Sequence, residues 1–267
     1  MPQFGPLDNN SAADTLSSVA PADSLVPVDT LVPVDTLVPV DPVDPVDPVD
    51  TVVQTALPGW YELPAIADAD RDGVDDNDAS LYYASHSFSM NNKEYRNYTV
   101  CFSADYHCPV WVAAPRHSVY EQKNVKRTDA YAKDPSIPAD IQYNSKSTGG
   151  DCNKGHMLGS AERLCSREAN VQVFYYTNIA PQLSAGFNTG GGGWNILEDW
   201  VDGQVCSASE LKCVAFVRAH TNSLKGQKPS SREMMSVSDL EKITGFSYFA
   251  NVPNAPKDSF SASDWGL

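Results

Sequence analysis

The sequence has no long uninterrupted run of apolar residues and no pair of cysteines separated by just two residues. A helix needs about 20 largely apolar residues to cross a bilayer, so we expect no transmembrane segment. No signal-peptide pattern is present either, and we expect export to depend on a leader or anchor that this sequence does not contain. Because zinc sites usually use closely spaced cysteines, the cysteine pattern argues against structural zinc.

The six cysteines fall as three pairs of near neighbours. An even number of cysteines favours disulfides in an exported protein, and we expect the local pairing. The alternative is that some of them are free thiols that pack as small hydrophobic groups. The expected pairs are Cys101 with Cys108, Cys152 with Cys165, and Cys206 with Cys213.

Basic residues are scarce in the first third of the chain. Residues 1–57 carry nine Asp and no Lys, Arg or Glu, and residues 58–78 carry seven acidic residues against Arg71 alone. From Ala79 onward there are 18 acidic and 18 basic residues. The net charge of −15 therefore belongs to the N-terminal part, and a basic groove for a polyanion is compatible with the neutral remainder. Such binding should weaken as salt rises.

Residues 1–57 form a low-complexity segment of Asp, Pro and Val. Asp-Ser-Leu-Val-Pro-Val at 23–28 recurs with Thr at 29–34 and 35–40, and then shortens to Asp-Pro-Val over 41–49. Dense proline disfavours helix and sheet, and the regular aspartates keep the chain solvated. We interpret the segment as a semi-rigid spacer that holds a secreted protein off a surface or cell wall. The alternative is a disordered tail without a role.

Residues 58–80 form an acidic linker that contains Asp68, Asp70, Asp72, Gly73 and Asp76. Alternating carboxylates before a glycine are typical of the first half of a calcium loop, where the turn directs oxygens onto one ion. The pattern resembles the Asp-rich repeats of thrombospondin type 3 and dockerin modules. The Glu that closes an EF-hand loop is replaced by Ala79. We expect a structural Ca²⁺ site, with a solvated acidic hinge as the alternative.

Residues 81–267 are expected to form one α+β domain, an antiparallel central sheet flanked by helices. Residue patterns predict four strands and two helices. The helix around Trp194 has an apolar stripe that continues at Leu197 and Val201, and Ser238 with Gly245 indicates a short capped helix. The expected strands are 97–102, 109–114, 171–177 and 213–219.

A cation, a glycine and a histidine are consecutive at Lys154, Gly155 and His156, and Asn188 and Glu198 follow. Phosphodiester cleavage requires a base, positive charge and a Lewis acid. Imidazole titrates near neutral pH, and amide and carboxylate oxygens are ligands that Mg²⁺ prefers. The pattern therefore indicates a metal site that cleaves phosphodiesters. The other histidines lack this context, and we expect them to be structural: His86, His107, His117 and His220.

These residues resemble the DNA/RNA non-specific endonucleases, the sugar-non-specific nucleases built on a ββα-metal finger. The resemblance extends from about Tyr82 to the C-terminus. It is carried by the Lys-Gly-His run at 154–163, by the segment from Asn178 to Asn188, and by Leu197-Glu198. It implies an α+β fold that contains the ββα finger.

The resemblance also implies a role for each site residue. His156 is the general base, and Asn188 is the single protein ligand to Mg²⁺ or Mn²⁺. Glu198 orients the water molecules on that ion, while Arg127 and Lys154 stabilise charge on phosphorus. Lys154 stands where the family usually has Arg, so it lacks the bidentate fork. The alternative for Asn188 is a turn residue beside glycine.

Two departures from the family pattern affect the site. Gly190 to Gly193 lengthen the interval between Asn188 and the helix by about two residues, which predicts a more mobile loop. Asp202 stands where we expect a phosphate-binding Arg, and we expect Arg163 or Arg167 to compensate.

The sequence therefore predicts a secreted or surface-tethered, Mg²⁺-dependent endonuclease that hydrolyses DNA and RNA to 5′-phosphate products. Nothing in the sequence indicates a module that reads bases. Two alternatives stay open. One is an inactive nuclease-like protein that binds nucleic acid, and the other is a calcium-dependent surface adhesion protein.

Overall fold

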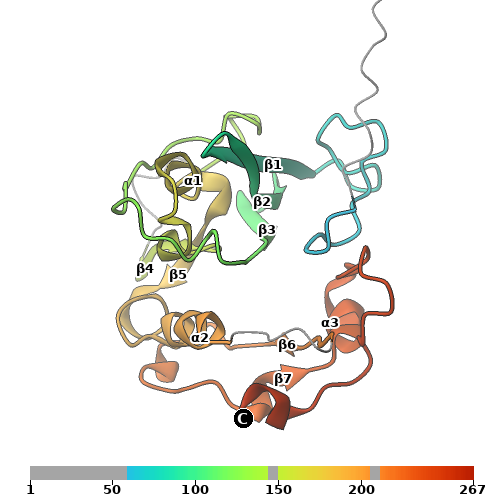
Figure 1. The fold of residues 1–267 in the computed structure, drawn as a ribbon, viewed down its shortest axis with the longest axis vertical. Helices are drawn as coiled ribbons and strands as arrows, with labels where there is room; N and C mark the ends of the chain where they lie inside the picture. The colour runs from blue at the N-terminus through green and yellow to red at the C-terminus, as the bar shows by residue number, and fades with distance from the viewer. Residues whose placement is uncertain (1–58, 144–149, 205–210) are drawn as a thin grey trace, which may run out of the picture. The chain divides into compact units, whose positions relative to one another are not determined.

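A computed structural model of the chain describes residues 59–143, 150–204 and 211–267 (Figure 1). These residues belong to one compact unit. The predicted spacer at 1–57 and Cys206 lie outside the described residues. No helix within the described ranges is long and apolar enough to cross a bilayer.

The first sheet contains three antiparallel strands in the order β1-β2-β3. They span Leu81–Met90, Lys93–Ser103 and Cys108–Ala113. Asn91 and Asn92 join β1 to β2 with φ values of 54° and 60°. A two-residue hairpin turn that matches strand twist needs left-handed backbone at both positions, and asparagine tolerates it.

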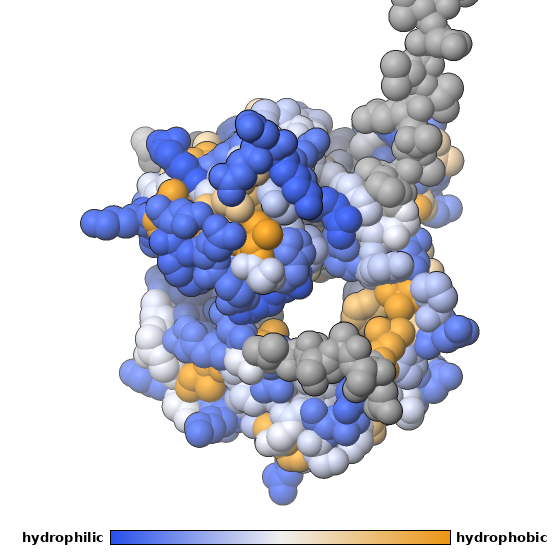
Figure 2. All heavy atoms as spheres, viewed as in Figure 1, coloured by the Kyte–Doolittle hydropathy of each residue, from blue (hydrophilic) through white to orange (hydrophobic). Residues whose placement is uncertain are grey.

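Each face of this sheet is covered by a hydrophobic cluster. On one face, Val100 and Phe102 pack in a cluster with Val173 and Phe174. On the other face, Tyr83, Cys101 and Trp111 form a second cluster. Because successive side chains of β2 point to opposite faces of the sheet, this one strand contributes residues to both clusters. The outer surface over this part of the chain is mainly hydrophilic in Figure 2.

The second sheet pairs β4 (Cys152–His156) with β5 (Ile179–Leu183) in antiparallel register. A π turn at Ser184–Asn188 follows β5 and leads through a glycine-rich loop into α2 (Gly193–Asp202). Helix α1 (Arg167–Gln172) lies in the connection between the two strands. Together β4, β5 and α2 form a ββα unit, with His156 as the last residue of β4.

In the C-terminal described residues, two strands of two residues each form a pair, and an α-helix follows them. Strand β6 (Ala215–Phe216) pairs with β7 (Met234–Met235), and α3 (Val237–Thr244) follows. The side chain of Ser236 caps α3, and Gly245 ends it with φ of 77°. The capped helix is confirmed, although its cap lies two residues before the predicted Ser238.

The structure confirms a mixed α+β arrangement with antiparallel pairing, but the strands in the described ranges form three small sheets in place of one central sheet. The strands expected at 97–102 and 109–114 correspond to β2 and β3, and the helix around Trp194 is α2. The strand expected at 171–177 is wrong, because α1 continues to Gln172 and a 3-10 turn spans Tyr176–Asn178. Of the strand expected at 213–219, only β6 forms.

Candidate active site

Gly155 allows the two strands of the ββα unit to approach closely. Opposite it in the register is Ala180, and the side chain of Gln182 crosses its face. A Cβ atom at position 155 would lie 2.0 Å from Cδ of Gln182. Only glycine leaves this space open, so the middle residue of the predicted triplet has a steric role.

His156 is half-buried at the end of β4, and its ring contacts two aromatic rings. The centroid of Phe174 lies 4.8 Å away in an edge-on arrangement, and that of Tyr131 lies 6.0 Å away. Nε2 of His156 is buried and has no hydrogen-bond partner among the described residues. An unsatisfied buried nitrogen is uncommon and points to a functional role.

The surroundings of His156 keep its ring neutral. Burial, followed by the positive charge of Arg127, lowers the pKa of His156 to about 4, while Asp129 acts in the opposite direction. At neutral pH the imidazole is therefore unprotonated and able to accept a proton.

Each of the two predicted cationic side chains lies over one of the aromatic rings that contact His156. The guanidinium of Arg127 lies 4.7 Å from the centroid of Phe174, and Nζ of Lys154 lies 4.3 Å from that of Tyr131. Arg127 also donates from Nη1 to Oγ of Ser160 at 2.7 Å. The structure thus brings Arg127 and Lys154 to rings that border the predicted base.

Gln182 links Asn188 to His156. Nδ2 of Asn188 donates to Oε1 of Gln182 at 2.5 Å, and Nε2 of Gln182 donates to the carbonyl oxygen of His156 at 3.4 Å. This hydrogen bond orients the carboxamide of Asn188, whose Oδ1 is the atom able to bind a cation. The structure therefore connects the expected base and the expected metal ligand, and Gln182 is a residue whose role we did not predict.

Glu198 lies half-buried on α2 and accepts a hydrogen bond from Nε1 of Trp194 at 2.8 Å. Burial, and next the charge of Glu162, raise the pKa of Glu198 to about 8. Glu162 in turn accepts from the backbone N–H of Gly159, three residues after His156. A bound cation would favour the charged form of Glu198. Among the described residues no hydrogen bond joins Glu198 to Asn188 or His156, so its place beside the metal stays a prediction.

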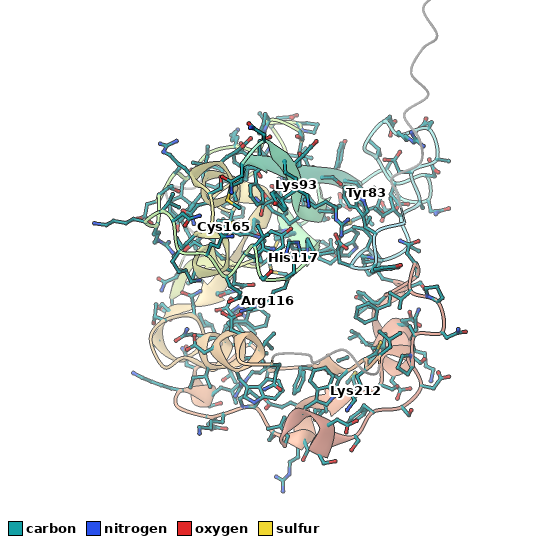
Figure 3. All side chains as sticks on the ribbon, viewed as in Figure 1. Tyr83, Lys93, Arg116, His117, Cys165 and Lys212 are labelled. Atoms are coloured by element: carbon teal, nitrogen blue, oxygen red, sulfur yellow. The ribbon has the colours of Figure 1, made fainter. Side chains whose placement is uncertain are left out.

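Arg163 does not face a substrate. Its side chain is 1% exposed, and it donates to Oδ1 of Asn97 and the carbonyl oxygen of Pro115. Of the two arginines expected to compensate for Asp202, Arg163 is therefore wrong, and Arg167 stays a prediction. Asp202 instead pairs with Arg116, which extends from the segment after β3 toward α2 (Figure 3).

Among the other histidines, His86 is 7% exposed and its Nε2 lies 2.9 Å from Oδ2 of Asp134. This contact is consistent with a structural role. His220 contacts the loop that carries Asn188, and neither it nor its neighbour Asn222 was predicted to affect the site.

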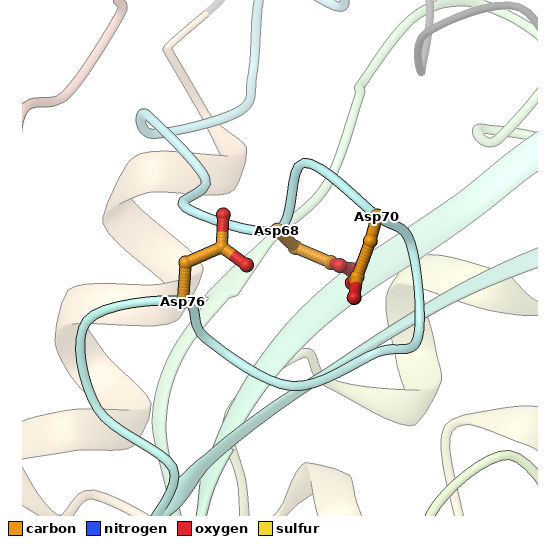
Figure 4. A group of neighbouring side chains, drawn as sticks. All are labelled: Asp68, Asp70 and Asp76. Carbon is orange, nitrogen blue, oxygen red and sulfur yellow. The ribbon is translucent and has the colours of Figure 1, made fainter.

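The acidic segment brings three of its four expected calcium ligands together. Oxygen atoms of Asp68, Asp70 and Asp76 lie within 4.8 Å of one another (Figure 4). Asp72 is outside this group and accepts a hydrogen bond from the backbone of Val74. Oδ1 of Asp68 is buried without a hydrogen-bond partner, and burial raises the pKa of this residue.

Between the cysteines that the structure describes, the expected disulfides are not formed. Cys101, Cys108, Cys165 and Cys213 are free thiols, so none of the three expected bridges forms between described residues. The register places Cys108 opposite Ser103, and Cys101 opposite Trp111. Cross-strand bridges need closely facing Cβ atoms, which this register does not provide. Burial raises the pKa of Cys101 to about 12, which keeps it protonated.

Comparison with known proteins identifies the family to which this chain belongs. Residues 77–231 match the DNA/RNA non-specific endonuclease family. The chain is 29% identical to a protein named Nuclease from Nostoc sp. over 167 residues, which are 58% of this chain and 59% of the relative. It is 30% identical to Nuclease 1, mitochondrial, from Schizosaccharomyces pombe over 86 residues, which are 32% and 26% of the two chains.

A crystal structure of the EndoG/EndoGI complex contains a chain with a similar fold. The TM-score is 0.50 at 18% identity, over 64% of this chain and 88% of the other. The match supports assigning β4, β5 and α2 to a ββα-metal fold. The chain belongs to the DNA/RNA non-specific endonuclease family. It spans about 26 to 59% of the length of the two curated relatives named above.

Proposed function

We propose that this protein is an Mg²⁺-dependent endonuclease that hydrolyses DNA and RNA to products with a 5′-phosphate. The arrangement around His156 carries the proposal. Its Nε2 is unprotonated and unpartnered, and Arg127 and Lys154 lie over the two aromatic rings that contact the imidazole. Gln182 connects the backbone carbonyl oxygen of His156 to the side chain of Asn188. This combination supplies a proton acceptor, positive charge and an oxygen ligand in one unit.

His156 takes a proton from a water molecule, whose oxygen then attacks phosphorus in line with the leaving group. The new O–P bond forms as the bond from phosphorus to the 3′ oxygen breaks, and solvent protonates the released 3′ alkoxide to give a 3′ hydroxyl. The phosphate stays on the 5′ side of the next nucleotide. Arg127 and Lys154 stabilise the additional negative charge on the phosphate oxygens during this step.

Mg²⁺ fits the donors that this chain provides. Oδ1 of Asn188 is a hard oxygen ligand with its amide nitrogen already occupied, and Glu198 supplies a carboxyl group for hydrogen bonds to metal-bound water. When bound, the ion supplies Lewis-acid stabilisation to the leaving 3′ oxygen. Mn²⁺ prefers similar oxygen ligands and is the expected substitute.

Digestion of plasmid DNA and of a structured RNA, with and without EDTA, tests this function. We expect cleavage of both substrates by the unmodified protein, loss of cleavage in EDTA, and 5′-phosphate ends. Intact nucleic acid that nevertheless binds the protein would favour the inactive binding protein. Attachment to surfaces that requires Ca²⁺ and persists in His156→Ala would favour the adhesion protein.

The acidic segment supports a second, structural role for a cation. Oxygen atoms of Asp68, Asp70 and Asp76 converge. The buried Oδ1 of Asp68 has no hydrogen-bond donor, and a Ca²⁺ ion would supply the missing partner. The segment also docks on the first sheet, because Val74 bridges to Tyr82 and Asp75 accepts from the hydroxyl of Tyr83. Ca²⁺ at this position would stabilise the start of β1.

An extracytoplasmic location is also part of the proposal. It rests on the repeated Asp-Pro-Val composition of residues 1–57, which suits a solvated spacer between a surface and the nuclease region. Fractionation of cells that express the natural gene, with detection by antibody, tests it. Protein confined to the cytoplasm would contradict this part of the proposal.

A further inference from the structure

Two side chains from a distant segment hold the loop that carries Asn188. Nε2 of His220 accepts a hydrogen bond from the backbone N–H of Leu183 at 2.9 Å, and Oδ1 of Asn222 accepts from that of Gly186 at 2.8 Å. The partners are 37 and 36 positions apart in the sequence. Each hydrogen bond therefore connects the loop that carries Asn188 to a segment that is distant in the sequence.

Close packing accompanies these hydrogen bonds. The buried ring of Phe187 lies 4.6 Å from the ring of His220 in an edge-on arrangement. A Cβ atom at Gly186 would lie 2.0 Å from the carbonyl oxygen of Asn222. The residue directly before Asn188 and a glycine two residues before it thus contact the same distant segment.

The loop needs such an external support. Asn188 ends a π turn, and four glycines at 190–193 follow Thr189. Glycine has more backbone freedom than other residues, so this stretch by itself fixes the carboxamide of Asn188 poorly. His220 and Asn222 are exposed and belong to none of the three hydrophobic clusters. Their contacts to the loop are therefore more important for its geometry than for the core.

We propose that His220 and Asn222 are positioning residues that hold Asn188 in place to bind the divalent cation. This inference rests on the proposed nuclease function. It explains how the family's metal-binding position is maintained in a chain whose loop is longer and richer in glycine. Removal of either acceptor should release the turn and weaken binding of the cation, while the base His156 stays in place on β4.

Two substitutions at each position test whether the hydrogen-bond acceptor matters, or only the bulk of the side chain. His220→Leu and Asn222→Ala remove the acceptors, whereas Asn222→Asp retains the oxygen acceptor and His220→Gln replaces Nε2 with an oxygen acceptor at similar reach. Ser223→Ala is the matched control, because its hydroxyl contacts Thr221 within the same segment. All five variants are made in the full chain.

The first readout is the Mg²⁺ concentration for half-maximal plasmid cleavage. We expect it to rise about tenfold in His220→Leu and Asn222→Ala, the loss expected for one hydrogen bond. Cleavage at saturating Mg²⁺ should stay within about threefold of the unmodified protein, since the chemistry of His156 is untouched. His220→Gln, Asn222→Asp and Ser223→Ala should behave like the unmodified protein.

The second readout is amide hydrogen exchange of the peptide over 183–188 without metal, which does not depend on nuclease activity. Faster exchange in the two acceptor-removing variants alone supports the positioning role. Unchanged exchange and unchanged Mg²⁺ requirement in those variants would overturn it. Equal losses of melting temperature in all four variants at His220 and Asn222 would also overturn it, as they would indicate a structural role. If the unmodified protein does not cleave nucleic acid, the proposed function is refuted instead. Hydrogen exchange would still test whether His220 and Asn222 hold the loop.

Discussion

The side chain of Gln182 occupies the space that a Cβ atom at Gly155 would fill, with the two atoms 2.0 Å apart. From this position Gln182 bonds to both His156 and Asn188. The glycine between Lys154 and His156 therefore determines where the carboxamide of Asn188, the predicted metal ligand, lies.

Replacement of this glycine should damage the site without removing any catalytic group. In Gly155→Ala, the new methyl group displaces Gln182, which holds both Asn188 and the backbone carbonyl of the base His156. We expect kcat for plasmid cleavage to fall about a hundredfold, as for other small misplacements of reacting groups. Gly190→Ala is the control, because its Cβ would meet nothing within 4 Å. Equal activities of these two variants would contradict the steric role of Gly155.

The low pKa of His156 has a measurable consequence. We expect NMR titration of its ring in metal-free protein to give a midpoint near pH 4, below the ordinary 6.5. Arg127→Gln removes a charge that disfavours the imidazolium, so it should raise this midpoint. A midpoint at or above 6.5 in the unmodified protein would refute a desolvated base.

The same group links pH to stability. Between pH 6.5 and about 4 the unfolded ring binds a proton while the folded ring does not, so stability should fall as pH falls through this window. Urea unfolding at several pH values measures the slope, and His156→Ala should reduce it. An unchanged slope in that variant would assign the acid sensitivity to other groups.

Calcium should stabilise the protein through the acidic segment. At a free concentration a hundredfold above Kd, binding would add about 2.7 kcal/mol and raise the melting temperature by several degrees. Asp70→Asn should abolish the increase. Asp72→Asn should retain it, since Asp72 lies outside the group of converging oxygens. If Ca²⁺ leaves the melting temperature of the unmodified protein unchanged, the segment is a solvated hinge.

The local parts of this site are predictable from sequence because they lie in short motifs. Lys154 and His156 share one strand, and the apolar stripe of α2 places Glu198 one turn after Trp194. A strand over 171–177 was wrongly predicted because short apolar runs carry no decisive period. In this segment the buried end of α1 and a 3-10 turn contain the same β-branched and aromatic residues that a strand would contain.

The contacts between distant segments are not predictable in this way. The role of Gln182 depends on strand register, and those of His220 and Asn222 depend on packing between segments 36 to 37 residues apart. The pairing of Asp202 with Arg116 joins residues 86 positions apart. No local pattern marks such pairs, since each residue alone is an ordinary polar residue in the sequence.

A double-mutant cycle tests most directly whether His156 and Asn188 serve one site. Plasmid cleavage is measured for the unmodified protein, His156→Ala, Asn188→Ala and the double variant at high Mg²⁺. We expect each single substitution to reduce kcat/KM about a thousandfold, and the double variant to be little worse than either. Losses that multiply in the double variant, or activity that survives His156→Ala, would contradict the assignment of a shared active site.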